Sequence, residues 1–349
     1  MELWERLKDA KKPIVLYGMG NGADRILDFL NNMGIAVDGI FASDGFVRHQ
    51  KFRGFTVQSY AELKGQFDEM IVLLAFGTQR PEVLENIKRI SMEQELYVPD
   101  VPVVGDTFFT KSFLQQHRNE LEAVYSMLSD DRSKEVFEKI VLGKLTGDPC
   151  YLWAAEDDEE QSDRVLTFSD DEVFLDLGAY TGDTALKFIR QHPRYERIIA
   201  VEPDIKNFKK CKENLKIYKN VEVVNACIDE HCGERFFLMD GGRKSVALDQ
   251  GGLAVPSINV DTLLNGNRVS YIKMDVEGME KAALIGAQKT IAEFRPKMLI
   301  SAYHRSEDLF ELPLLVKKFA GEFKLHLRHL SYLPAWDTNF YFNLSADDA

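Results

Sequence analysis

One stretch, Val173-Phe-Leu-Asp-Leu-Gly-Ala-Tyr-Thr-Gly-Asp-Thr184, constrains the fold of this chain more than any other. It begins as an apolar strand, turns through Gly178 and Gly182, and continues into an amphipathic helix. Glycine permits a tight turn and a close approach of the backbone to a ligand, and the helix directs its positive N-terminus at the same place. The pattern therefore predicts a strand–turn–helix unit that binds a nucleotide-like ligand.

An acidic residue beside this turn indicates which ligand to expect. Asp176 stands at the end of the strand, and Tyr180 replaces the second glycine of the dinucleotide fingerprint G-x-G-x-x-G. A carboxylate there would repel a pyrophosphate, whereas it suits a cation. S-adenosyl-L-methionine carries an ammonium and a sulfonium but no phosphate, so we expect it as the cofactor. The alternative is an ordinary βα turn whose acids are solvated.

A second apolar run, Arg197-Ile-Ile-Ala-Val-Glu-Pro-Asp204, also ends in an acid. Glu202 at its tip can accept hydrogen bonds from both hydroxyls of a ribose, a feature shared with NAD proteins. The residues after the third strand would flank the adenine. The expected cofactor-binding residues are Asp176, Gly178, Ala179, Tyr180, Gly182, Asp183, Thr184, Glu202, Pro203, Asn225, Ala226 and Cys227.

The composition excludes several classes of protein. The chain has 349 residues, enough for two domains, and its apolar content of 45% is that of a soluble globular protein. A net charge of -13 argues against a nucleic acid or an anionic membrane as partner. The acidic start does not fit a signal peptide, no run reaches transmembrane length, and no two cysteines form a C-x-x-C pair. We expect a cytoplasmic protein in a reducing compartment.

Residues 1–105 show the alternating strands and helices of a first Rossmann-like unit with a parallel sheet. Strands are predicted at 13–17, 35–41, 55–57 and 70–76, and helices at 23–32 and 81–90. The turn Gly18–Ala23 matches G-x-G-x-x-A with no acid before it, and Asp44 follows the second strand. This unit either binds a nucleotide or nucleotide sugar, or serves only packing or assembly; the residues leave both open.

Residues 106–168 have the spacing of helices, with a break at 129–131. We predict a helical linker or substrate cap here. The acidic run 156–160 is expected to be a solvated loop. Tyr151 and Trp153 offer aromatic rings that a sugar could stack on, as a less favoured alternative to ordinary packing.

Residues 169–349 return to strand–helix alternation and end with two strands, 324–330 and 339–344, that have only a short turn-like segment between them. Such a pair is expected to be antiparallel and to lie at the sheet edge. The predicted fold class is α/β. It has two Rossmann-like domains joined by a helical segment, and the C-terminal domain has a class I methyltransferase sheet that ends in an antiparallel hairpin.

With these residues in view, the C-terminal half resembles the FkbM-type family of S-adenosylmethionine-dependent methyltransferases. The matching segments follow in the family's order over about residues 170–344, whereas the first 105 residues carry no comparable motif. The segments are 176–184, 201–204, 225–226, 260–264, Ile272-Lys-Met-Asp-Val-Glu-Gly-Met-Glu280, 284–287, Pro296 and Ser301-Ala-Tyr-His304. The resemblance implies methylation of hydroxyl groups, often on sugars or secondary metabolites. Tyr180 departs from the smaller residue that many members carry.

The stretch around Asp275 is predicted to carry the chemistry. Asp275 ends an apolar strand, Glu277 follows in the loop, and His304 follows the next strand. Methyl transfer to a hydroxyl needs a positioned oxygen and a route for its proton. These three residues could form a base with its orienting partner, or a divalent-metal site, and Lys273 could neutralise them. Each residue also has a purely structural alternative. Asp275 could cap a helix, Glu277 could be an acid in a loop, and His304 could be a hydrogen-bonded core residue.

The sequence thus predicts an O-methyltransferase that acts on a small, carbohydrate-containing acceptor, either a sugar or a nucleotide sugar. The motif Asn-Pro-Pro-Tyr of base-methylating enzymes is absent, which counts against nucleic acid as substrate. Two alternatives remain open: a cofactor-binding regulatory module without turnover, and a nicotinamide oxidoreductase that uses the Gly18 turn. The need for a divalent metal and assembly into a homo-oligomer are also left open.

Overall fold

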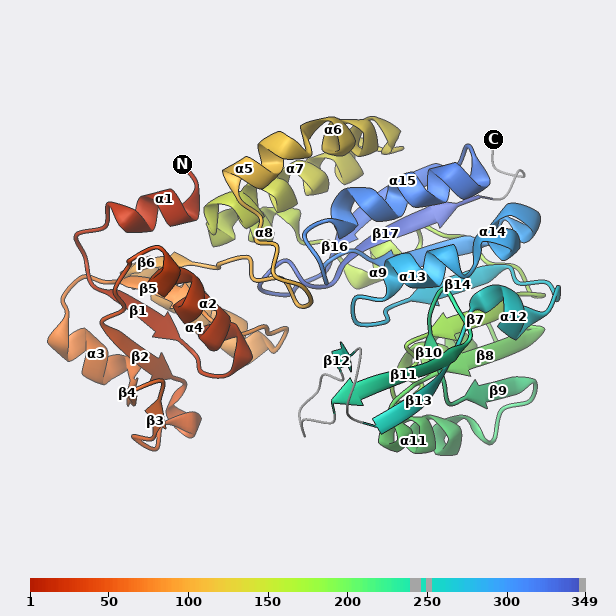
Figure 1. The fold of residues 1–349 in the computed structure, drawn as a ribbon, viewed down its shortest axis with the longest axis horizontal. Helices are drawn as coiled ribbons and strands as arrows, with labels where there is room; N and C mark the ends of the chain where they lie inside the picture. Colours follow the sequence, from red (N-terminus) through yellow and green to blue (C-terminus); the bar gives the residue numbers. More distant parts are fainter. Residues whose placement is uncertain (239–245, 249–252, 345–349) are drawn as a thin grey trace.

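The computed structural model describes residues 1–238, 246–248 and 253–344. Its strands form a six-stranded, a seven-stranded and a four-stranded sheet, and the two larger sheets are built mainly from parallel pairs. Figure 1 shows the first α/β unit and the C-terminal unit at opposite ends of the molecule, with helices α5 to α8 along one side of both. The expected α/β class is confirmed.

The first sheet has the strand order β3-β4-β2-β1-β5-β6, with only β3–β4 antiparallel. β1 and β5 are buried along their whole length, because helices cover both faces of the sheet. One face packs on α1 and α2 and the other on α3 and α4. The elements are α1 Leu3–Lys8, β1 Ile14–Tyr17, α2 Asn21–Asn32, β2 Gly39–Ala42, η1 Asp44–Phe46, β3 Lys51–Phe52, β4 Phe55–Ser59, α3 Tyr60–Gln66, β5 Ile71–Leu74, α4 Pro81–Glu93 and β6 Glu95–Tyr97.

The second strand of this sheet is shorter than predicted. The expected strand at 35–41 begins only at Gly39. Just before it, the carboxylate of Asp38 accepts the N–H of Ile14 at 2.8 Å. Strand β6 was not predicted. In the first turn of α2, a Cβ at Gly22 would collide with the carbonyl of Ala75, so close packing accounts for this glycine.

The middle of the chain is helical, as its spacing predicts, and α6 and α7 are separated at the predicted break. The acidic run 156–160 is not wholly a loop. Asp158 caps α9, and Glu159 and Glu160 form its first turn, where carboxylates interact favourably with the helix dipole. The helices are α5 Lys111–Gln116, α6 Arg118–Met127, α7 Asp131–Thr146, α8 Pro149–Ala155 and α9 Glu159–Asp163.

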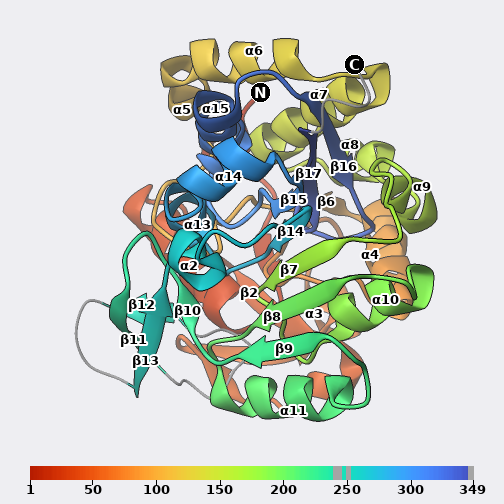
Figure 2. The same ribbon diagram turned by 90° about the vertical axis from the view of Figure 1, so that its right-hand side faces the viewer.

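The seven-stranded sheet has the order β16-β17-β15-β14-β7-β8-β9. Its first two strands form the predicted antiparallel pair at the edge, which Figure 2 shows beside β15. Helices α10 and α11 cover one face, and α13 to α15 cover the other. The elements are β7 Val173–Leu177, α10 Asp183–Gln191, β8 Arg197–Val201, α11 Ile205–Leu215, β9 Val221–Val224, α12 Val260–Leu264, β14 Tyr271–Met274, α13 Glu280–Ile285, α14 Gln288–Phe294, β15 Lys297–Ser301, α15 Asp308–Ala320, β16 Lys324–His329 and β17 Thr338–Asn343.

A small sheet that the sequence did not predict follows β9. Its order is β10-β13-β11-β12, and it lies beside the lower part of the C-terminal unit in Figure 1. Its strands are β10 Cys227–Ile228, β11 Gly233–Leu238, β12 Val246–Leu248 and β13 Leu253–Ile258. Because β10 directly follows the β9 turn, this sheet fixes the residues expected near an adenine.

The units share one core. A single buried cluster runs from β1 and β5 of the first sheet through α6 and α7 to β14, β15 and α15 of the C-terminal unit. The units also meet through main-chain hydrogen bonds, described below. Among the described residues, no helix is long and apolar enough to span a membrane.

Candidate active site

The carboxyl ends of the C-terminal strands open into one cavity of about 1300 Å³. Its walls come from the turns after β7, β8, β9, β14 and β15, from the β16–β17 turn, and from Gly77, Gln79 and Val103 of the first unit. Ligands of α/β sheets bind at this end of the strands. A pocket for one ligand typically measures about 300–1,000 Å³, so this cavity has room for a cofactor and a second molecule.

The β7–α10 turn has the backbone that its sequence predicts. Gly178 has a φ of +80°, and a Cβ there would collide with the carbonyl oxygen of Asp275. This glycine therefore lets the turn after β7 lie directly against the turn after β14. Tyr180 is half exposed at a φ of +48°, at the surface of the cavity.

Glu202 lies at the tip of β8, as predicted, and its carboxylate faces the cavity. One carboxylate oxygen accepts the N–H of Tyr180 at 2.8 Å and the other accepts the N–H of Asp204 at 2.9 Å. Each oxygen keeps a second lone pair, so the pair of oxygens can accept two hydroxyl groups. Burial raises the pKa of Glu202 to about 7, although the two N–H donors oppose this rise.

Lys273 joins the two strand-end acids. Its ammonium lies 3.6 Å from Asp176 and 3.9 Å from Asp275, and it donates to the carbonyl oxygen of Gly178 at 3.0 Å. Asp176 is fully buried and, in the described part of the chain, neither of its oxygens has a hydrogen-bond partner. Burial raises the pKa of Asp176 to about 6, against the opposing effect of Lys273. Lys273, not Asp176, reaches the cavity wall.

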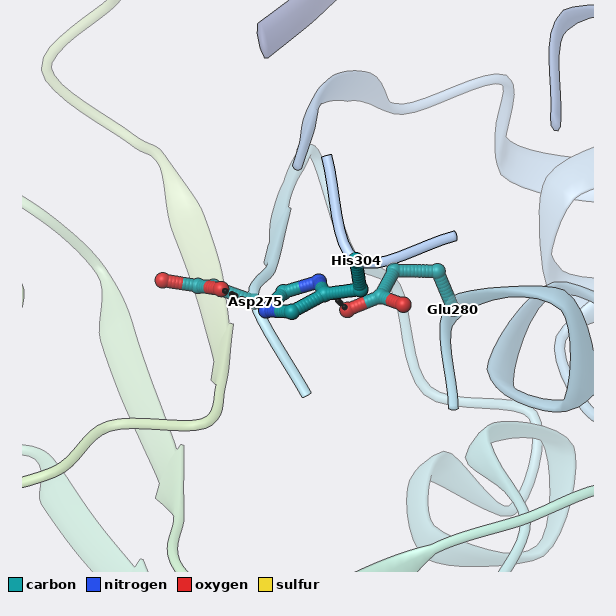
Figure 3. Close-up of side chains that lie close together, drawn as sticks. All are labelled: Asp275, Glu280 and His304. Carbon is teal, nitrogen blue, oxygen red and sulfur yellow. Dashed lines mark ion pairs between the residues drawn. The ribbon is translucent and has the colours of Figure 1, made fainter. Parts of the chain in front are cut away.

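Asp275 and Glu277 line the cavity, and His304 lies directly behind them. The Nε2 atom of His304 is 3.5 Å from Asp275 and 3.6 Å from Glu277. Its Nδ1 atom is 3.1 Å from Glu280, a carboxylate that is completely buried. Figure 3 shows His304 lying between Asp275 and Glu280. The three predicted catalytic side chains are therefore brought together, with Glu280 as a fourth member.

The charges of this group determine which side chain can take a proton. Burial lowers the pKa of His304, but Glu280, Asp275 and Glu277 outweigh burial and raise it to about 9. Burial raises the pKa of Asp275, but Lys273 and His304 outweigh it and hold this pKa below its usual range. At neutral pH, His304 is thus an imidazolium, and Asp275 is the ionised acceptor. Asp275 also accepts the hydroxyl of Tyr303 at 3.1 Å.

Comparison with known proteins bears on this site directly. Residues 176–339 match the family model described as the methyltransferase FkbM domain. The C-terminal half of this chain is an FkbM methyltransferase domain. It is an S-adenosylmethionine-dependent methyltransferase, as its strand-end acids and glycine turn predict.

A solved FkbM structure has the same overall fold as this chain. A crystal structure of methyltransferase FkbM from Methylobacillus flagellatus KT has a TM-score of 0.72 at 21% identity, over 95% of this chain and 90% of that one. Aeropyrum pernix fibrillarin, in complex with natively bound S-adenosyl-L-methionine, has a TM-score of 0.33 at 15% identity, over 51% of this chain and 69% of that one. No curated protein matches the chain.

Eight of the twelve residues expected to bind the cofactor line the cavity, and four do not. Tyr180, Asp183, Thr184, Glu202, Pro203, Ala226 and Cys227 line the cavity with Gly178. Four expected cofactor residues do not line it: Asp176, Ala179, Gly182 and Asn225. Asn225 instead donates to the carbonyl oxygens of Glu202 and Pro203 at 2.8 and 3.0 Å. It supports the β8 turn that presents Glu202.

Several site residues were missed by sequence reasoning. The sequence gives Glu280 and Tyr303 only as parts of family segments, and it gives no signal for Tyr332 and Trp336. Glu280 accepts the N–H groups of Val276 at 2.9 Å and Gly278 at 3.4 Å, so it shapes the turn after β14. Tyr303 sits beside His304 in the predicted segment, and this proximity was the available signal. Tyr151 and Trp153, the aromatic residues that were considered, do not line the cavity.

A divalent metal also has candidate ligands in the FkbM domain. Asp275, Glu280 and His304 each offer one ligand atom, and these atoms lie within 4.8 Å of one another. Neither ring nitrogen of His304 has a hydrogen bond with the described residues, so a nitrogen is available to a metal once its proton is lost. The donor set of carboxylate oxygens and one imidazole suits Mn²⁺ or Mg²⁺.

Proposed function

We propose that this FkbM domain transfers the methyl group of S-adenosylmethionine to a hydroxyl of a small, carbohydrate-containing acceptor. The observation that carries the proposal is the position of Asp275. Its ionised carboxylate lines the same cavity as the cofactor turn and is held between the cations of Lys273 and His304. A negative acceptor at this point suits a neutral hydroxyl group, whose proton must leave as the methyl group arrives.

The chain's own residues perform three tasks in this reaction. When bound, S-adenosylmethionine supplies an electrophilic methyl group on a sulfonium. Glu202 holds two hydroxyl groups of the ribose, and Lys273 keeps the β7 and β14 turns in register through Asp176 and the Gly178 carbonyl. Asp275 accepts the proton of the acceptor hydroxyl, whose oxygen forms the new bond to carbon. The imidazolium of His304 orients Asp275 and is not itself the base at neutral pH.

The metal version of this proposal is less favoured, because the imidazolium of His304 is already a cation among the three carboxylates Asp275, Glu277 and Glu280. The two versions differ in a simple measurement. A proton-only site keeps its turnover in excess chelator. A metal site loses turnover in chelator and regains it with added Mg²⁺ or Mn²⁺.

We propose that the first unit serves this reaction and does not bind a ligand at its own glycine turn. Tyr17 stacks on Phe41 with ring centroids 4.5 Å apart, and Phe76 packs edge-on against Tyr17 at 4.9 Å. These rings fill the carboxyl end of β1, where a nucleotide would enter. The free cysteines support our further proposal of a reducing, cytoplasmic setting.

The test uses the full-length protein, S-adenosylhomocysteine and a panel of sugars and nucleotide sugars. We expect S-adenosylhomocysteine to raise the melting temperature by mass action, NADH to leave it unchanged, and methyl transfer to at least one sugar hydroxyl. A folded protein that binds neither S-adenosyl ligand contradicts the proposal. Binding without transfer to any hydroxyl compound would instead favour the regulatory module.

A further inference from the structure

One part of the cavity is built jointly by the two α/β units. After β5, Thr78 pairs with Leu333 of the β16–β17 turn through two main-chain hydrogen bonds, of 2.8 and 3.0 Å. These bonds join the first sheet to the turn that carries Tyr332 and Trp336. The first unit is therefore part of the wall of the methyltransferase cavity.

The contact beside this bridge is unusually close. A Cβ at Gly77 would collide with the six-membered ring of Trp336, so only glycine lets the backbone lie against this ring. The ring centroid of Tyr332 lies 5.6 Å from that of Trp336. Gly77, Tyr332 and Trp336 all line the cavity. We call Tyr332 and Trp336 the aromatic pair.

The segment that leaves the first unit reaches the reacting groups themselves. The N–H of Val104 donates to the carbonyl oxygen of His304 at 2.9 Å. The side chain of Val104 packs so closely on Gly278 that a Cβ at Gly278 would be only 2.8 Å from it. Val103 lines the cavity. The aromatic pair and the proposed base are thus connected to the same unit on two sides.

The charge of the walls limits what this part of the cavity can hold. Among the described residues, the lining of the whole cavity carries nine carboxylate side chains and four lysines or arginines. Three of the four cations pair with carboxylates: Lys187 with Glu159 and Asp163, Arg164 with Glu160, and Lys273 with the strand-end acids. The fourth, Arg190, lies on α10, away from the turn that carries the aromatic pair. Asp337 directly follows Trp336 in the chain, and Asp275, Glu277 and Asp337 all act electrostatically on Tyr303 in the same cavity wall. A phosphate group placed there would be repelled by several carboxylates.

We infer that the first unit and the aromatic pair together form the acceptor subsite, and that its occupant is a hydroxyl compound without phosphate or carboxylate groups. Such a molecule presents an apolar face to Tyr332 and Trp336 while a hydroxyl group reaches Asp275. An amino substituent is compatible with this subsite, because aromatic faces and carboxylates both attract cations. A nucleotide sugar is excluded from it by its diphosphate. The inference rests on the proposed methyl transfer and names its substrate class.

The experiment compares acceptors that differ only in charge. Full-length protein is given S-adenosylmethionine and a panel of methyl glycosides, their 2-amino analogues, the corresponding sugar 6-phosphates and UDP-sugars. Formation of S-adenosylhomocysteine is measured. We expect transfer to neutral or amino members, and at least about tenfold lower kcat/KM for each phosphorylated counterpart. Faster transfer to a phosphorylated member than to its neutral counterpart would overturn the inference.

Variants test the contribution of the first unit. Gly77→Ala should displace the ring of Trp336 and raise the acceptor KM at least about tenfold, while S-adenosylhomocysteine binding stays within about twofold of wild type. Tyr332→Ala and Trp336→Ala should act in the same direction, and they decide the question if Gly77→Ala fails to fold. The matched control is Gly65→Ala, an exposed helical glycine of the same unit with open space around it.

The outcomes separate this inference from the function on which it rests. Loss of S-adenosylhomocysteine binding in the wild-type protein contradicts the proposed function itself. Normal binding with no transfer to any neutral or amino member overturns the acceptor class alone. An unchanged acceptor KM in all three variants overturns the role of the first unit.

Discussion

Lys273 illustrates how single residues set the properties of this site. A buried ammonium between two strand-end carboxylates lets both acids stay close without mutual repulsion. Burial lowers the pKa of Lys273, but Asp176 and Asp275 outweigh it and raise this pKa, so the cation persists at neutral pH. Asp275 can therefore be ionised inside the cavity wall, which a base for a hydroxyl group requires.

The first prediction concerns this base. Asp275→Asn preserves the shape of the side chain but removes its charge, so no carboxylate is left there to accept the proton of the acceptor hydroxyl. We expect turnover to fall at least about 100-fold, with S-adenosylhomocysteine affinity near that of wild type. Steady-state kinetics and calorimetry measure the two quantities. Wild-type turnover in this variant would require another base.

The second prediction concerns Glu202 and pH. The ribose hydroxyl groups donate to the ionised carboxylate, so cofactor binding favours the charged form. Because the pKa of Glu202 is about 7 in the free protein, affinity should fall as pH decreases through 7. Between pH 8 and pH 6, we expect S-adenosylhomocysteine to bind about tenfold more weakly. Glu202→Gln should remove most of this pH dependence; a wild-type affinity that is constant over this range would place the ribose elsewhere.

At the scale of elements, the turn between β14 and α13 depends on the helix that follows it. Glu280, the first residue of α13, holds two N–H groups of this turn and also contacts the Nδ1 atom of His304. The helix start thus fixes both the path of the turn and the orientation of the imidazolium. Asp275 itself does not cap α13, since the residue at the N-cap is Met279.

The third prediction tests Glu280 as a positioning residue. In Glu280→Gln the imidazolium loses its closest carboxylate, so the pKa of His304 should fall from about 9, by about one unit or more. The alkaline limb of the kcat–pH profile should move to lower pH by the same amount. Glu293→Gln, an exposed glutamate on α14, is the control. A loss of stability without any shift of the limb would mean that Glu280 is only structural.

The elements that could be predicted from the sequence are those marked by a pattern of neighbouring residues. β7, β8, β14 and β15 are apolar runs that end in polar residues, and the acids at three of these ends follow directly from them. The small sheet after β9 gave no such signal. The aromatic pair was missed because its partner, Gly77, lies far away in sequence. Glu280 was missed because its contacts are to main-chain N–H groups, which no side-chain motif reveals.

At the scale of the whole molecule, the buried core is continuous across the two α/β units. The units are also joined by main-chain hydrogen bonds at Thr78–Leu333 and Val104–His304. An interface of this kind does not behave as a flexible linker between independent domains. A ligand that binds in the C-terminal cavity should therefore also stabilise the first sheet against unfolding.

The fourth prediction follows from this coupling. We expect one cooperative unfolding transition in urea, and S-adenosylhomocysteine should slow hydrogen exchange in β1 and β5 as well as in β7 and β14, because global opening exposes all four strands. Exchange measured by mass spectrometry, with and without the ligand, tests this. A first unit that unfolds in a separate, ligand-insensitive transition would contradict it.

The close packing of Gly77 on Trp336 has a consequence for how related enzymes can change their substrates. The residues proposed to hold the methyl donor lie on the turns after β7 and β8, whereas the proposed acceptor subsite is lined by two turns from distant parts of the chain. Substitutions in those two turns can alter the substrate without disturbing the donor or the proton acceptor. The parts of the chain that set the reaction are thus different from the parts that set the choice of substrate.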